Sequence, residues 1–223
     1  MKKIIVVSPH ADDETLGSGG YLLKHKEQGD QIFWLNITDI KEEYGYSVEK
    51  CMLRKKEIEQ VNKEFGFEKM YNLQLKPAGL DQYDIGYLVK KISEVFKEVR
   101  PQIIILPNRT DVHSDHRIVF EAAFSCTKAF RYPEIEWIMC MQVLSETDYA
   151  DNAEGFLPNY YVNIEKQLLQ KIEIAKIYES EIQEFPFPRS EECIRALAVL
   201  HGGSCFCKAA EAYRIVKGIE GEL

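Results

Sequence analysis

Runs of consecutive apolar residues predict the strands in the first half of the chain. They occur at residues 4–7 and within 102–107, and the second is the clearest. Residues 31–38, which are rich in aromatic and β-branched residues, and residues 69–75 are also predicted as strands. Apolar runs without alternation are typical of strands that are covered on both faces, as in a parallel sheet between two layers of helices.

Between these runs, apolar residues return every three or four positions, which predicts amphipathic helices over 16–28, 47–65 and 83–100. Gly29, Gly66 and Pro101 follow them as helix stops. Strand and helix alternate at a spacing of roughly 30 residues, as in right-handed βαβ units. We therefore expect an α/β fold with a Rossmann-like, mainly parallel sheet flanked by helices, in a single domain over residues 1–223.

The second half of the chain has weaker patterns. They predict helices over 117–130 and 165–183, a strand over 137–143, a helix that begins at Ser190 and breaks at residues 201–204, and a last helix that carries Ala209, Ala210, Tyr213 and Val216.

Composition narrows the classes of function. A net charge of −8 and the absence of a basic cluster argue against a nucleic-acid partner. The apolar runs are much shorter than a membrane span. Six cysteines are scattered without a compact framework, which favours reduced thiols and a cytoplasmic protein. The sequence leaves a homo-oligomer open and predicts no role for Arg195, His201 or the Cys205/Cys207 pair.

Polar residues follow the first and fourth predicted strands. His10 and three consecutive carboxylates, at 12–14, come directly after the first strand, and His113 and His116 follow the fourth. Ligands of open α/β sheets bind beyond the carboxyl ends of the strands, so these two loops are expected to meet. His10 and Asp13, with His113 or His116, then offer two imidazoles and a carboxylate, and a catalytic zinc site needs three protein ligands.

Three further residues complete the roles that metal-assisted hydrolysis requires. Asp12 remains free as a general base, and Asp115 can orient an imidazole. Arg54 is the first residue of the apolar face of the helix over 47–65. Because this helix begins at the same edge of the sheet, Arg54 can reach an anion or a sugar hydroxyl there. Pairing of Arg54 with Glu57 is the structural alternative.

Other functions are compatible with parts of this pattern. Two histidines and one carboxylate also bind Fe(II) in oxygenases, so the sequence does not fix the metal. A magnesium-dependent phosphoryl-transfer domain would use Asp12 and Asp13 but would leave His113 and His116 unexplained. A non-catalytic module is the third alternative, although residues 17–20 do not form a dinucleotide-binding G-x-G-x-x-G motif.

The same residues resemble the motifs of a known family. Residues 9–14, Pro-His-Ala-Asp-Asp-Glu, resemble the PHPDDE signature of the LmbE-like (PIG-L) zinc N-deacetylases, and residues 113–116, His-Ser-Asp-His, resemble the HPDH signature. Residues 53–57 and 210–213 resemble that family's R-x-x-E and A-E-x-F/Y elements. Ala11 and Ser114 replace the usual prolines, which changes loop stiffness and not ligand chemistry.

This resemblance implies a LmbE-like fold that holds zinc in place of a dinucleotide. It implies that His10, Asp13 and His116 are the zinc ligands and that Asp12 is the general base. The reaction that it implies is hydrolysis of the N-acetyl group of a small amino sugar, such as N-acetylglucosamine or its conjugates.

Three more roles come from the resemblance. His113 is expected to stabilise the oxyanion, in its protonated form, with Asp115 orienting it. Arg54 is expected to contact the substrate. The sequence leaves open which sugar is used, free or linked to a nucleotide, a lipid or a thiol precursor.

Overall fold

The computed structural model describes residues 1–151 and 155–219. Its strands are β1 (Lys3–Ser8), β2 (Gln31–Thr38), β3 (Lys69–Leu75), β4 (Ile103–Leu106), β5 (Trp137–Met141), β6 (Tyr160–Asn163) and β7 (Ala210–Gly218). Its helices are α1 (Asp13–Glu27), α2 (Val48–Phe65), α3 (Ile85–Val99), α4 (Ser114–Ser125), α5 (Leu168–Ala175) and α6 (Glu191–Cys205), with short 3-10 turns η1 (Glu42–Tyr44) and η2 (Leu80–Gln82).

The described strands form one sheet in the order β3-β2-β1-β4-β5-β7-β6. Strands β1 to β5 are parallel, whereas β7 is antiparallel to both β5 and β6. Because β1 lies between β2 and β4, the loops that follow β1 and β4 are neighbours at one edge of the sheet. This arrangement confirms the predicted α/β fold with a mainly parallel sheet flanked by helices.

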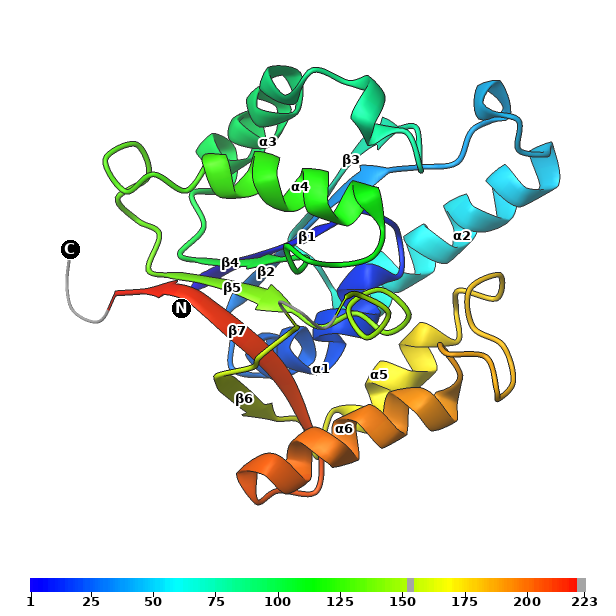
Figure 1. Ribbon diagram of the computed structural model, residues 1–223, viewed down its shortest axis with the longest axis vertical. Coiled ribbons are helices and arrows are strands. Elements are labelled where there is room, and N and C mark those ends of the chain that lie inside the picture. The colour runs from blue at the N-terminus through cyan, green and yellow to red at the C-terminus, as the bar shows by residue number, and fades with distance from the viewer. Residues whose placement is uncertain (152–154, 220–223) are drawn as a thin grey trace.

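Helices cover both faces of the sheet, with α3 and α4 on one side and α1, α5 and α6 on the other (Figure 1). Alternate residues of β1 pack on opposite faces of the sheet. Ile4 and Val6 belong to the hydrophobic core that includes residues of α1 and α5, and Ile5 and Val7 belong to the core that includes residues of α3 and α4. This explains why β1 is apolar without interruption. Within the described residues, no helix is both long and apolar enough to cross a bilayer.

Local signals set the ends of α2 where the sequence predicted them and those of α3 within two residues of the prediction. The Ser47 side chain accepts a hydrogen bond from the Lys50 backbone N–H, which caps α2, and Gly66 ends this helix with a φ of 65°. The Asp84 carboxylate caps α3 by accepting from the backbone N–H groups of Gly86 and Tyr87.

The C-terminal predictions were less accurate. Residues 210–218, predicted as a helix, form strand β7, and residues 201–204 continue α6 instead of breaking it. Strand β6 was not predicted, and α5 covers only part of the first half of the helix predicted over 165–183. Gly202 lies inside α6 because the chain crosses close by: a Cβ there would lie 2.6 Å from the Cys207 carbonyl oxygen. Close packing therefore explains a glycine that looks like a helix stop.

Candidate metal centre and active site

The polar residues singled out in the sequence lie together beyond the ends of β1 and β4. His10 lies in the loop after β1, and Asp13 is the first residue of α1. His113 precedes α4, and Asp115 and His116 lie in its first turn. The His10 backbone N–H donates to Asp13 Oδ2 at 2.8 Å, so the first loop closes on the start of α1.

His10, Asp13 and His116 form a candidate metal site. Each offers one ligand atom, and these atoms lie within 4.8 Å of one another. Asp13 Oδ2 is 3.3 Å from His116 Nε2 and 3.7 Å from His10 Nδ1. Asp13 and His116 are buried, whereas His10 is partly exposed and lines the adjoining pocket. Two nitrogens and one oxygen are a donor set that suits a catalytic zinc ion with an open position.

The state of the His116 ring supports metal binding. Its Nε2 atom is buried and makes no well-formed hydrogen bond among the described residues, although Asp13 Oδ2 lies 3.3 Å away; a buried polar atom without a good hydrogen bond is costly. Its other nitrogen, Nδ1, lies 2.8 Å from Asp111 Oδ2. A carboxylate that holds one ring nitrogen while the other faces the ligand position is typical of metal-binding histidines. Sequence reasoning missed Asp111, which lies five residues before His116.

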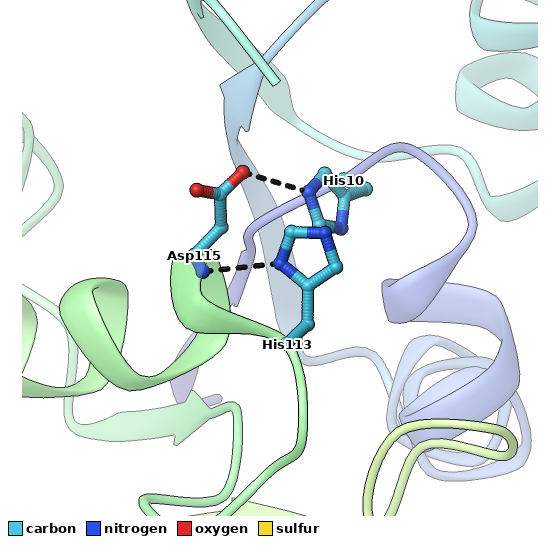
Figure 2. Close-up of side chains that lie close together, drawn as sticks. All are labelled: His10, His113 and Asp115. Atoms are coloured by element: carbon cyan, nitrogen blue, oxygen red, sulfur yellow. Dashed lines mark hydrogen bonds and ion pairs between the residues drawn. The ribbon is translucent and has the colours of Figure 1, made fainter. Parts of the chain in front are cut away.

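His10, His113 and Asp115 form a second group (Figure 2), which shares His10 with the first. Asp115 Oδ2 is 3.1 Å from His10 Nε2, and the same carboxylate accepts from the backbone N–H groups of Ala78 and Leu80. Because these contacts occupy the carboxylate, Asp115 is better placed to hold His10 and the 78–80 loop than to bind a metal. Its orientation of His113 stays a prediction, since their contact runs through the Asp115 backbone.

That backbone contact defines the state of His113. The Asp115 N–H donates to His113 Nδ1 at 3.1 Å, so a neutral ring carries its proton on Nε2. Burial, together with the neighbouring His10, lowers the pKa of His113. The two ring centroids lie 4.6 Å apart. His113 is thus a hydrogen-bond donor beside the candidate metal site without needing a positive charge.

Asp12 lies next to the candidate ligands but outside both groups. Its backbone φ is 145°, a strained conformation for a residue with a side chain, and such strain costs on the order of 1–3 kcal/mol. Burial raises its pKa to about 7, while Arg189 acts to lower it and Asp13 to raise it further. Asp12 Oδ2 accepts from Arg189 Nη1 at 2.7 Å. A buried, strained carboxylate with this pKa suits a general base.

Arg54 lies at the site, but its guanidinium is largely occupied by the protein. It donates to Glu57 at 2.9 Å, to the Ala11 carbonyl at 3.2 Å, to Ser180 at 3.0 Å and to Glu181. The pairing with Glu57 is the structural alternative considered from the sequence. Contact of Arg54 with substrate stays a prediction.

A pocket of about 400 Å³ opens beside the candidate metal site. Its lining includes His10, Asp12, His113, Tyr46, Lys50, Arg54, Glu146, Glu181 and Arg189. Glu146, Glu181 and Arg189 lie in connections after β5 and after α5, and no sequence pattern predicted that these connections reach the pocket. Arg189 follows Phe-Pro-Phe-Pro at 185–188, a segment that the sequence marked only as a rigid connector.

Known proteins resemble this chain over most of its length. A diacetylchitobiose deacetylase from Thermococcus kodakarensis is 26% identical over 231 residues, which cover 98% of this chain and 85% of that protein. A probable N-acetyl-alpha-D-glucosaminyl L-malate deacetylase 2 from Bacillus cereus is 26% identical over 167 residues, covering 68% and 76%. The solved structure of the conserved protein TT1542 from Thermus thermophilus has a TM-score of 0.80 at 23% identity and covers 100% and 98%.

The family comparison includes both halves of the candidate site. The family described as PIG-L, GlcNAc-PI de-N-acetylase, matches residues 5–127, which contain His10, Asp13 and His116. This match covers more than half of the chain and agrees with the resemblance of the two signature motifs. The chain therefore belongs to the PIG-L family of deacetylases, which are amide hydrolases.

Proposed function

We propose that this chain is a zinc-dependent deacetylase that hydrolyses the N-acetyl group of a small amino sugar. The observation that carries the proposal is the convergence of His10, Asp13 and His116 on one ligand position, with Asp12 beside it and outside the ligand set. Metal-assisted hydrolysis needs this separation, because the base must not be a ligand.

His10 Nδ1, Asp13 Oδ2 and His116 Nε2 would hold the zinc ion. When bound, zinc supplies a Lewis acid for the acetyl carbonyl and lowers the pKa of water toward about 7. The contact between Asp115 and His10 Nε2 would fix the His10 ring, and Asp111 would do the same for His116.

Asp12 and His113 would handle the protons. Asp12 accepts a proton from the attacking water while the water oxygen forms a bond to the carbonyl carbon of the acetyl group. His113 donates a hydrogen bond from Nε2 to the acetyl oxygen, where negative charge develops. When the carbon–nitrogen bond breaks, Asp12 returns the proton to the leaving nitrogen. The products are acetate and the free amino sugar.

The pocket suits a ligand with hydroxyl groups. The carboxylates of Glu146 and Glu181 line it, and the guanidinium groups of Arg54 and Arg189 already pair with carboxylates of the protein. A neutral sugar can donate hydroxyl hydrogen bonds to these carboxylates, whereas an anionic conjugate would have to compete for the paired arginines or rely on Lys50, the other cation that lines the pocket. We therefore propose a neutral N-acetylated sugar, with N,N'-diacetylchitobiose or N-acetylglucosamine as first candidates. An N-acetylglucosaminyl malate is the anionic comparison.

Acetate release from these three compounds tests the proposal. Purified chain is loaded with zinc or, without oxygen, with Fe(II), and acetate and metal content are measured together. We expect release from the neutral sugars, and Asp12→Asn is expected to keep the metal and lose about 10²–10⁴-fold in rate. A metal-loaded chain that releases no acetate from any of the three, or an active Asp12→Asn variant, would contradict the proposal.

A further inference from the structure

Arg189 has no role in the proposed reaction, yet it contacts Asp12, the proposed base. Its Nη1 atom donates to Asp12 Oδ2 at 2.7 Å and to Glu181 Oε2 at 3.0 Å. Its Nε donates to Ser145 Oγ at 2.8 Å, and Nη2 lies 3.4 Å from Glu146 Oε1. One guanidinium therefore joins three segments around the pocket: the loop after β1, the segment after β5 and the segment after α5.

These contacts fix the direction of the guanidinium. A guanidinium is planar, so hydrogen bonds from different nitrogens fix its orientation. Nε donates to Ser145, and Nη1 donates to Asp12 and Glu181. Ser145 itself has a φ of 67°, in the left-handed region that favours glycine. A non-glycine residue in this conformation aims its hydroxyl at Nε, which indicates that the surrounding structure determines this contact.

The contact determines what Asp12 can do. With Oδ2 bound by Arg189, the carboxylate cannot rotate freely, and the proton of the attacking water is left to Oδ1. Glu181 joins Arg189 to Arg54, because its Oε1 accepts from Arg54 while its Oε2 accepts from Arg189. Arg54 in turn donates to the carbonyl of Ala11, the residue before Asp12. The backbone and the side chain at the base are thus both held by arginines.

We propose that Arg189 is a positioning residue for this reaction: it holds Asp12 Oδ2 so that Oδ1 faces the water. The proposal rests on the proposed function, in which Asp12 is the base. Direct binding of substrate is the competing role for a cation that lines the pocket. Positioning is favoured because four of the five N–H groups of Arg189 already have partners within the protein.

Steady-state kinetics separate the two roles. In zinc-loaded Arg189→Ala, a positioning role is expected to lower kcat by about 100-fold, with KM within about threefold and zinc content unchanged. Millimolar guanidinium chloride is expected to restore part of kcat, and Arg189→Lys to restore less, because an ammonium lacks the planar fork. An increase in KM at unchanged kcat would overturn the proposal, since it is the signature of substrate binding.

Arg195→Ala is the matched control. Arg195 pairs with Glu191 on α6, outside the residues that line the pocket, and its removal is expected to leave kcat and KM unchanged. The control shows what loss of one partly exposed arginine and its ion pair does to the fold alone.

A double-mutant cycle tests the contact without any activity. Unfolding in urea is measured for metal-free wild type, Asp12→Ala, Arg189→Ala and the double variant. If the side chains interact, the unfolding constant of the double variant is expected to differ about tenfold from the product of the single effects. Effects that multiply within about twofold would overturn the proposal. If the Asp12 and Arg189 side chains interact but the wild-type chain releases no acetate, the proposed function fails while the contact stands. If they interact but Arg189→Ala has an unchanged kcat, the positioning role of Arg189 is overturned.

Discussion

Two histidines of one short motif differ in what surrounds their ring nitrogens. His116 has Nδ1 fixed by Asp111 and a buried Nε2 without a well-formed hydrogen bond among the described residues, whereas His113 uses Nδ1 to accept a backbone hydrogen bond and lines the pocket. The sequence motif does not distinguish them, but their partners do. The first arrangement suits a metal ligand and the second a hydrogen-bond donor to substrate.

Substituting each histidine tests this difference. His116→Ala is expected to lose zinc, because it removes a ligand atom. His113→Ala is expected to keep zinc and lose about 10²–10³-fold in turnover, because it removes a donor to the developing negative charge. Zinc content and acetate release, measured on the same preparations, show which histidine binds zinc and which contributes to turnover alone. If both variants retain zinc, or if the roles are reversed, the assignment is wrong.

Asp111 should matter to the metal without touching it. Its Oδ2 holds His116 Nδ1 and also accepts from the Asn108 backbone N–H. We expect Asp111→Ala to weaken zinc binding about 10–100-fold, measured by competition with a chelator of known affinity. Asp111→Asn keeps an acceptor and is expected to have a smaller effect. Equal zinc affinity in all three proteins would exclude this role.

At the scale of elements, the small residues of helix α1 allow close approach. Gly17, Gly19 and Gly20 lie on it, and a Cβ at Gly20 would be 2.6 Å from Ile164 Cγ2. The missing side chains let polar groups reach the helix: Lys171 Nζ donates to the Leu16 carbonyl at 2.8 Å. The small residues after the acidic triplet therefore pack α1, the element that carries Asp13, against the C-terminal half of the chain.

Glu211 completes this packing and explains the A-E-x-F/Y element. It accepts from the backbone N–H groups of Gly20 and Tyr21 at 2.7 Å each, from Lys171 and from the Tyr213 hydroxyl. Strand β7 thus reaches α1 through one buried carboxylate. The residues of this sequence motif have structural partners, which accounts for a motif outside the pocket.

Alanine at Gly20 tests the close packing. We expect Gly20→Ala to lower the free energy of unfolding by about 1–3 kcal/mol, because the added Cβ would overlap the fully buried Ile164 side chain, which would have to shift. Urea unfolding measures the change. Gly203→Ala is the control: Gly203 lies in α6 with nothing within 4 Å of the added Cβ, and alanine there is expected to stabilise by about 0.5–1 kcal/mol. Equal effects at the two positions would argue against the packing role.

At the scale of the whole molecule, the candidate metal site joins segments that are distant in sequence. His10 and Asp13 follow β1, His116 comes more than 100 residues later, and the three lie within one ligand sphere. Without a metal, the buried His116 Nε2 makes no well-formed hydrogen bond among the described residues and has only the Asp13 carboxylate nearby, at 3.3 Å. Metal binding should therefore stabilise the folded chain, because the unfolded chain does not hold these ligands together.

Thermal unfolding with and without metal measures this coupling. At a free zinc concentration about 100 times Kd, binding contributes about 2.7 kcal/mol. For a chain of this size the expected increase in Tm is about 5–10 °C. A chelator should reverse it, and His116→Ala should show no increase. A Tm of the wild type that responds to neither zinc nor chelator would contradict metal binding at this site.

The sequence by itself determined the parallel half of the sheet and the content of two loops. Strands β1 and β4 were predictable because burial on both faces requires uninterrupted apolar residues, and β2 because it is rich in aromatic and β-branched residues. Parallel strand order then places the loops that carry His10, Asp13 and His116 at one edge, so the candidate ligands were accessible to sequence reasoning. Local caps such as Ser47 and Gly66 were predictable too, since each acts within one turn of its helix.

Only the tertiary structure decided the rest. Residues 210–218 form strand β7 because they pair with β5 and β6, and no local pattern reveals these partners. Gly202 lies inside α6 because the chain returns from beyond the helix and packs closely on it, which the sequence alone does not show. Arg189 reaches Asp12 from 177 positions away. Ion pairs of this kind depend on where loops are brought by packing, and side chains in irregular segments carry no periodic signal.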